Sequence, residues 1–183
     1  MLFRSVLGVN LNGVVNGLQV FLEHIKQHGQ GGHIVNTASM AGHLAVPGLG
    51  VYNASKFAVV AISETLANDL SGSRIGISVL CPSHHEQTGI FENSARYRPQ
   101  AFGGPMTDAE IRATFGRTDE QREEALGPRR RQERFPDECA ARVVRAIRDR
   151  QFYIFTHPET RAAVEHRFVQ MFAGFDDSDS FTG

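Results

Sequence analysis

The sequence predicts an α/β fold in which a parallel sheet of three strands is flanked by helices. Three short β-compatible segments, near 33–38, 75–81 and 152–155, are separated by longer segments with helical periodicity. Strands that alternate with helices are typical of a parallel sheet. With 183 residues, the chain has the length of one domain and can bury a sizeable core.

The first expected strand, 33–38, runs directly into Ser39. In open α/β sheets the carboxyl ends of the strands face the ligand crevice, so Ser39 is expected to lie at a site. A loop punctuated by glycine and proline follows, and a long helix begins near Tyr52.

Tyr52 and Lys56 are four residues apart, so a helix places them on one face, one turn apart. A phenol with its ordinary pKa of about 10 is a poor acid or base at neutral pH. A nearby ammonium group favours the phenolate by charge attraction. Together with the neutral hydroxyl of Ser39, this pair suits proton transfer to or from a C–O group.

Ser39 lies thirteen residues before Tyr52, and Tyr52-Asn-Ala-Ser-Lys56 is a Tyr-x-x-x-Lys motif. With the surrounding Asn36-Thr-Ala-Ser-Met-Ala-Gly42, this arrangement resembles the short-chain dehydrogenase/reductase family. The resemblance implies an oxidoreductase that interconverts an alcohol and a carbonyl with NAD or NADP. It assigns acid–base catalysis to Tyr52, and to Lys56 both support of the phenolate and contact with the nicotinamide ribose. It assigns Ser39 to the substrate oxygen. The alternative is a helix with an ordinary i,i+4 pair.

Residues 3–28 form the first expected helix, with a broad apolar face. The segment Val9-Asn-Leu-Asn-Gly13 is similar to the family's Val-Asn-x-x-Gly, whose asparagine kinks the helix and holds a water of the proton relay. By that resemblance Asn10 joins the catalytic set; otherwise it is a helix-surface asparagine. His24 and His28 have metal-ligand spacing but no third ligand nearby, so we expect a solvated helix end and no metal site.

The helix expected over 52–70 is apolar around most of its circumference, which indicates burial on more than one side. One side is expected to cover the sheet, and the other fits a partner helix. In the resembling family the equivalents of 3–28 and 52–70 pack against their copies, which implies a homo-oligomer.

The second strand, 75–81, leads into the expected cofactor loop. The family has Pro-Gly here, then a threonine about five positions past the proline, and these groups hold the nicotinamide carboxamide. By resemblance Pro82 and Thr88 bind the cofactor, although Ser83 replaces the glycine and Thr88 lies six positions past Pro82. The adjacent His84 and His85 invite interpretation as a metal pair or an extra acid–base group, but neighbouring residues rarely point the same way.

Residues 91–134 are rich in charge and glycine, and by resemblance they form a variable substrate lid. Thr107 and Glu110 form a capping-box pattern for a short helix over 108–115. The basic run near Arg129 lacks interleaved aromatic residues, so a solvated helix face is favoured over a nucleic-acid site.

The C-terminal part predicts a helix over 136–150 and the third strand. Thr156-His-Pro-Glu159 is a capping-box pattern for a last helix that carries Val164, Phe168 and Val169. The small, acidic segment 174–183 is expected to be a disordered tail.

The family's first strand and its Gly-rich turn, which cradles the pyrophosphate at a helix N-terminus, have no counterpart in this sequence. The chain 1–183 is therefore interpreted as one incomplete domain, the second half of a doubly wound, Rossmann-type sheet. A wrongly assigned start, a gene fragment and a genuine half-domain remain open. The rival to an enzyme is an inactive module that acts only in oligomerisation or interaction.

Composition and net charge limit the classes of partner that the chain is expected to bind. The net charge of −1 points to neither nucleic acid nor an acidic membrane surface. We find no uninterrupted apolar run of membrane-spanning length and no signal-peptide pattern, so no membrane partner is expected. Cys81 and Cys139 lack metal-type spacing and are interpreted as reduced thiols of a cytoplasmic protein. The family resemblance implies that the substrate is a small-molecule alcohol or carbonyl compound.

Overall fold

A computed structural model describes residues 2–83, 88, 90–98, 100, 103–115 and 136–179. The predictions for His84, His85 and the basic run near Arg129 lie outside these residues.

Three parallel strands form one sheet in the order β1-β2-β3, as the sequence predicts. They are β1 (Gly32–Thr37), β2 (Ile75–Cys81) and β3 (Tyr153–Phe155). Strand β1 pairs with β2 from Gly32 opposite Ile75 to Thr37 opposite Leu80. The pairing is favourable because six of the seven β2 residues are buried, and such an apolar strand is stable only when both sheet faces are covered.

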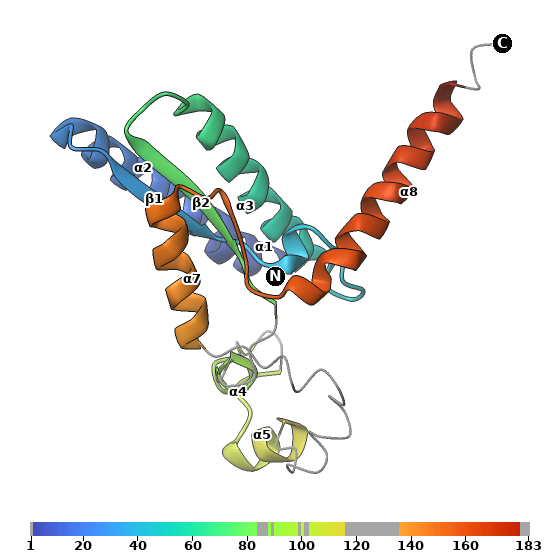
Figure 1. The fold of residues 1–183 in the computed structure, drawn as a ribbon. Coiled ribbons are helices and arrows are strands. Elements are labelled where there is room, and N and C mark those ends of the chain that lie inside the picture. Colours follow the sequence, from blue (N-terminus) through green and yellow to red (C-terminus); the bar gives the residue numbers. More distant parts are fainter. Residues whose placement is uncertain are drawn as a thin grey trace.

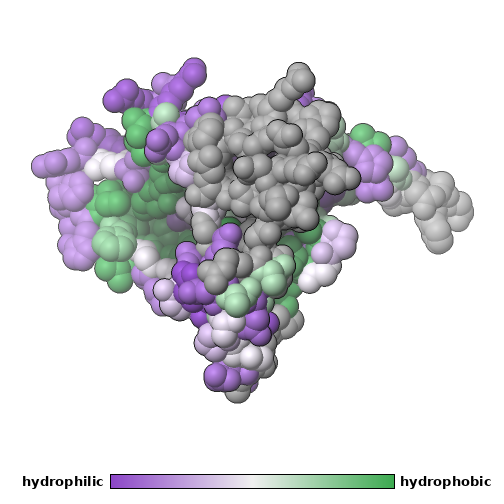
Figure 2. Space-filling view, turned by 90° about the horizontal axis from the view of Figure 1, so that it is seen from below, coloured by the Kyte–Doolittle hydropathy of each residue, from purple (hydrophilic) through white to green (hydrophobic). Residues whose placement is uncertain are grey.

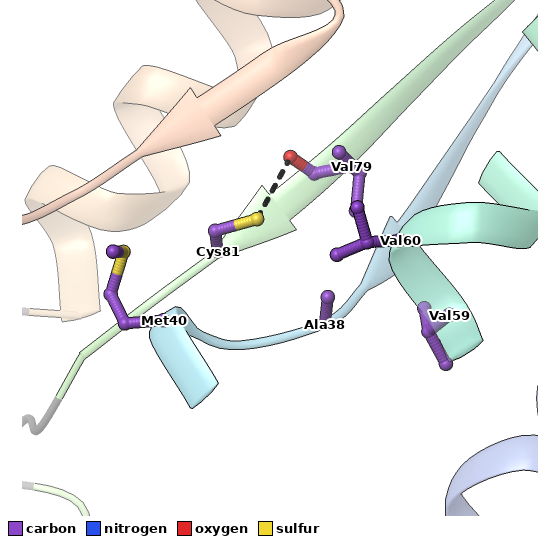
Figure 3. Packing of buried hydrophobic residues seen from close by; sticks show 6 residues of the cluster. All are labelled: Ala38, Met40, Val59, Val60, Val79 and Cys81. Atoms are coloured by element: carbon purple, nitrogen blue, oxygen red, sulfur yellow. Dashed lines mark hydrogen bonds between the residues drawn. The ribbon is translucent and has the colours of Figure 1, made fainter. Parts of the chain in front are cut away.

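Helices α3 (Gly50–Asp69) and α7 (Pro136–Asp149) lie on opposite sides of β1 and β2 (Figure 1). Both contact β2. A buried core lies between the sheet and α3, near the carboxyl ends of β1 and β2 (Figure 3). Its members are Ala38, Met40, Val59, Val60, Val79 and Cys81. The core therefore lies directly beneath the predicted site residues.

The predicted N-terminal helix is present as α1 (Leu2–Leu7), a π-helical turn η1 (Gly8–Asn12) and α2 (Gly13–His28). The run ends at Gly29, whose φ of 69° is a left-handed conformation that suits glycine. Within it, Arg4–His28 is long and apolar enough, by length and composition alone, to cross a membrane. The sequence was expected to contain no membrane-spanning segment, because glycine and asparagine residues interrupt its apolar run. The mean hydropathy of the segment is nevertheless apolar.

The segment predicted as a lid contains α4 (Ile90–Arg96) and α5 (Asp108–Phe115), and α5 has the predicted bounds. The Thr107–Glu110 capping box is confirmed. The Thr107 amide donates to Glu110 Oε2 at 2.8 Å, and the Glu110 amide donates to Thr107 Oγ1 at 3.3 Å. Figure 1 shows both helices beyond the carboxyl end of β2.

The last helix differs from the prediction in two ways. A 3-10 turn, η5 (Pro158–Thr160), precedes α8 (Arg161–Asp179). His157 occupies the N-cap position of η5, but its side chain makes no capping hydrogen bond there. The Thr156 capping box is therefore wrong, because the Thr156 hydroxyl bonds to the His157 ring instead. The expected tail also starts too early, since α8 continues five residues past Gly174. Residues 180–183 lie outside the described part.

Gly42 allows η2 (Met40–Gly42) to approach α3 closely. A Cβ atom at Gly42 would lie 2.8 Å from both the Lys56 carbonyl oxygen and Val60 Cγ2. Gly50 offers a matched control because a Cβ there meets nothing within 4 Å.

We therefore expect Gly42→Ala to lower the free energy of unfolding by about 1–3 kcal/mol, the usual cost of overpacking. Gly50→Ala is expected to leave it unchanged or to raise it slightly, since alanine favours helix over glycine. Urea denaturation followed by circular dichroism measures both. Equal stability of Gly42→Ala and the wild type would show that η2 and α3 do not pack this closely.

Candidate active site

Ser39 lies where β1 ends and η2 begins. Its backbone is extended, with φ of −178°, and its side chain caps η2 by accepting the Ala41 amide at 3.1 Å. The Ser39 hydroxyl in turn donates to the Pro82 carbonyl at 3.3 Å. The hydroxyl is therefore held at the carboxyl end of the sheet, beside the loop that follows β2.

Tyr52 and Lys56 lie in the first two turns of α3, both only partly buried. Lys56 Nζ is 5.7 Å from the centroid of the Tyr52 ring. It also donates to the Thr37 carbonyl at 3.1 Å. An ammonium group has three donors, so this anchor leaves two for another acceptor. The last residue of β1 thus holds the lysine near the tyrosine.

Burial lowers the pKa of Lys56, because a partly desolvated ammonium group loses hydration. The nearby Cys81 would oppose this shift only as a thiolate. Burial raises the pKa of Cys81 to about 12, so it remains a neutral thiol at physiological pH. The desolvation effect on Lys56 is therefore the one that operates.

Asn10 lies within the π-helical turn η1, a distortion that is frequent at functional sites. Its side-chain amide donates to Ser55 Oγ at 3.3 Å, and the Ser55 hydroxyl donates to the Tyr52 carbonyl at 2.7 Å. Asn10 therefore reaches the backbone of Tyr52 through a serine that sequence reasoning overlooked. Ser55 was visible as the fourth residue of the Tyr-x-x-x-Lys motif, but its buried position was not.

The loop after β2 is held by a second residue that the sequence did not single out, His157. The Ser83 amide donates to His157 Nδ1 at 3.3 Å, and the same nitrogen lies 2.7 Å from Thr156 Oγ1. The Pro82 carbonyl, on the other end of that peptide group, accepts Ser39 Oγ and the Met40 amide. One peptide group thus connects Ser39 to buried His157.

The structure gives less detail for Thr88 and for the histidines considered as metal ligands. Thr88 is half-buried at a bend beyond Ser83, and residues 84–87 between them are outside the described part. Within the residues that the structure describes, no group of three or more His, Cys, Asp or Glu side chains could hold a metal ion. His28 instead accepts the Gln30 amide at 3.2 Å.

The chain is similar to known proteins in both sequence and structure. A family model described as short chain dehydrogenase matches residues 1–98. The structure is similar to that of a short chain dehydrogenase/reductase from Burkholderia phymatum solved with NAD, with a TM-score of 0.68 and 37% identity over 92% of this chain and 59% of that one. A putative short-chain dehydrogenase from Novosphingobium aromaticivorans gives 0.63 and 31%, covering 98% of this chain and 56% of that one.

A curated relative, the C alpha-dehydrogenase of Sphingobium sp., is 29% identical over 168 residues. That alignment covers 91% of this chain and 51% of the relative, so the chain spans about half the length of the relative it matches. The chain belongs to the short chain dehydrogenase family, and its three-stranded parallel sheet with flanking helices matches the Rossmann-type folds of that family.

The chain contains two lysines, Lys26 and Lys56, so the pKa of Lys56 can be measured without ambiguity. We expect a value below the ordinary 10.5, because burial disfavours the charged form in the folded state. Stability should then rise as the pH increases from the folded-state pKa towards 10.5, since the unfolded chain binds more protons in that interval.

Side-chain NMR of ¹³C-labelled lysine measures this titration, and the Lys26→Arg variant assigns the Lys56 signal. A midpoint at or above 10.5 would contradict the buried position of the ammonium group.

Proposed function

We propose that this chain supplies the catalytic half of an NAD(P)-dependent oxidoreductase that interconverts an alcohol and a carbonyl by a Ser-Tyr-Lys mechanism. The observation that carries the proposal is the anchoring of Lys56 on the Thr37 carbonyl beside the Tyr52 ring. It links the two elements that hold Ser39 and Tyr52.

In this mechanism Tyr52 donates a proton to the carbonyl oxygen during reduction and removes it during oxidation. Lys56 favours the phenolate form of the tyrosine by charge attraction. Ser39 holds the substrate oxygen. Its hydroxyl already donates to the Pro82 carbonyl, so the hydroxyl must either rotate to donate to the substrate oxygen or accept a hydrogen bond from a substrate hydroxyl. Asn10 acts at a distance, through Ser55, by supporting the backbone of Tyr52 and the proton relay.

The residues present fit part of a nicotinamide dinucleotide, NAD or NADP. The two remaining donors of Lys56 suit a ribose diol, and Pro82 and Thr88 lie on the loop proposed to face the nicotinamide carboxamide. The nicotinamide supplies the hydride when it is bound. The Burkholderia relative was solved with NAD, which supports this cofactor class for the present chain.

We also propose self-association through α1, α2 and α3. The α1 to α2 run exposes large apolar side chains, with Val9, Val20 and Phe21 exposed by 73%, 54% and 64%. Figure 2 shows apolar surface on the left of the view, the side on which α2 lies. Partner helices would remove this surface from water. The two free thiols suit the cytoplasm that we propose as the location.

The second candidate is an inactive interaction module. It is favoured by one observation, that the chain spans about half of its curated relative. The sequence contains no Gly-rich pyrophosphate cradle, so the isolated chain would depend on Tyr52, Lys56 and the Pro82 loop for the cofactor.

A chimera tests the catalytic proposal. The segment of the Burkholderia phymatum relative that precedes its aligned region would be joined ahead of residue 1. We expect this protein to oxidise a secondary alcohol with NAD or NADP, and Tyr52→Phe to reduce kcat by at least about a thousandfold with little change in cofactor affinity, since one phenolic proton is removed. Ser63→Ala, a buried change on the same helix, serves as a control for folding. Comparable turnover by Tyr52→Phe would refute the acid–base role.

The isolated chain gives a separate expectation. Calorimetry should show NAD(H) and NADP(H) binding no tighter than about millimolar, because most phosphate contacts of this cofactor class come from a Gly-rich turn at a helix N-terminus. Micromolar binding by the isolated chain would contradict a dependence of cofactor affinity on such a turn.

A further inference from the structure

Helix α8 carries large apolar side chains that are exposed within the described part of the chain. Its first turns are anchored, with Val164 packed against the core and the Arg167 guanidinium 5.1 Å from the centroid of the Phe57 ring. The rest of the helix projects away from the sheet (Figure 1). Phe172 and Phe175 are 61% and 66% exposed, although a phenylalanine on a surface helix is normally covered.

The exposed aromatic residues form one continuous stripe. Phe168, Phe172 and Phe175 follow one another at intervals of four and three residues, so they lie on the same face of the helix. The rings of Phe168 and Phe172 are 6.4 Å apart, which confirms that they are neighbours on that face. The stripe spans about 10 Å, two turns of helix.

The charges of α8 are arranged against its own dipole. Its first turn contains no acidic residue and starts with Arg161, whereas its last turn contains no basic residue. Asp176 is exposed near that end, and the sequence continues with Asp177 and Asp179. Cations at a helix N-terminus and anions at its C-terminus are both unfavourable. The ends of α8 therefore lack compensation within the helix, apart from the exposed Arg161–Glu165 pair.

We propose that α8 pairs with α8 of a second copy of this chain in antiparallel orientation. In this arrangement the aromatic stripes cover each other about a two-fold axis near residue 170, so that Phe168 of each copy lies opposite Phe172 of the other. The basic start of each helix then lies beside the acidic end of its partner, which compensates both dipole ends at once. Such a contact is isologous, so one face of the helix suffices for both copies.

This surface is distinct from the α1 to α3 surface proposed above. Each surface pairs one copy of the chain with one other copy. A chain that uses both surfaces therefore contacts two different copies, which allows an assembly larger than a dimer. A short helix pair is a small interface, so its association is expected to be weak and dependent on protein concentration. An anionic membrane is a poorer occupant, since the end of the stripe is acidic.

The first test compares two glutamate substitutions by analytical ultracentrifugation of the full chain. Phe172→Glu places a charge in the stripe, and we expect self-association through α8 to weaken at least tenfold. Gln170→Glu adds the same charge two residues earlier, on the other side of the helix, and is expected to leave the mass distribution unchanged. Far-ultraviolet circular dichroism verifies that both variants keep α8 helical.

The second test reverses charges at the two ends of the helix at low salt. Arg161→Glu and Asp176→Arg are each expected to weaken association roughly threefold, the effect of an exposed charge pair. The double variant restores opposite charges between antiparallel partners and is expected to recover the wild-type association. A parallel pair would not respond in this way, because like ends would face each other throughout.

Identical mass distributions for the wild type and Phe172→Glu, at every concentration from roughly 5 to 500 µM, would overturn the proposal, since even a weak interface of this size associates in that range. Equal effects of Phe172→Glu and Gln170→Glu would overturn it as well. So would binding of the wild type to vesicles of neutral phosphatidylcholine through the stripe without self-association. The outcome does not depend on the catalytic proposal, because no variant touches the site.

Discussion

The parallel ladder between β1 and β2 continues past the ends of both strands, and the site depends on this extension. The Ala38 amide donates to the Leu80 carbonyl at 2.8 Å, and the Met40 amide donates to the Pro82 carbonyl at 2.9 Å. Ser39 lies between these two bonds, so its backbone has little freedom. An extended backbone with paired amides is rigid, which is what the role proposed for the Ser39 hydroxyl, holding a substrate oxygen, requires.

The helix side of the site depends on the same segment. Lys56 reaches the Thr37 carbonyl because η2 packs tightly on α3, with only a glycine hydrogen at Gly42 between them. The buried core lies below this contact, and Val59, Val79 and Cys81 are fully buried there. Site and core are therefore one packed unit, and a change of volume in either is expected to move the lysine relative to the tyrosine.

Local sequence was sufficient where the relevant contacts are local. The strands, α5 and the Tyr52–Lys56 face follow from periodicity and turn residues within short windows. His157 could not be predicted in this way, because its contact with Ser83 joins residues 74 positions apart. The Thr156 capping box failed for a related reason, since the His157 ring competes for the same hydroxyl. The extent of α8 was underestimated because Gly174 weakens a helix by only about 1 kcal/mol.

Amide hydrogen exchange, followed residue by residue by NMR, tests the extended ladder most directly. We predict that the amides of Ala38 and Met40 are protected to within about tenfold of those in the interior of β2, such as Val79. If the interior of β2 is protected while Ala38 and Met40 exchange at the rate of an unstructured peptide, the ladder ends before Ser39. The position of that serine, and with it the proposed site, would then not be fixed by the fold.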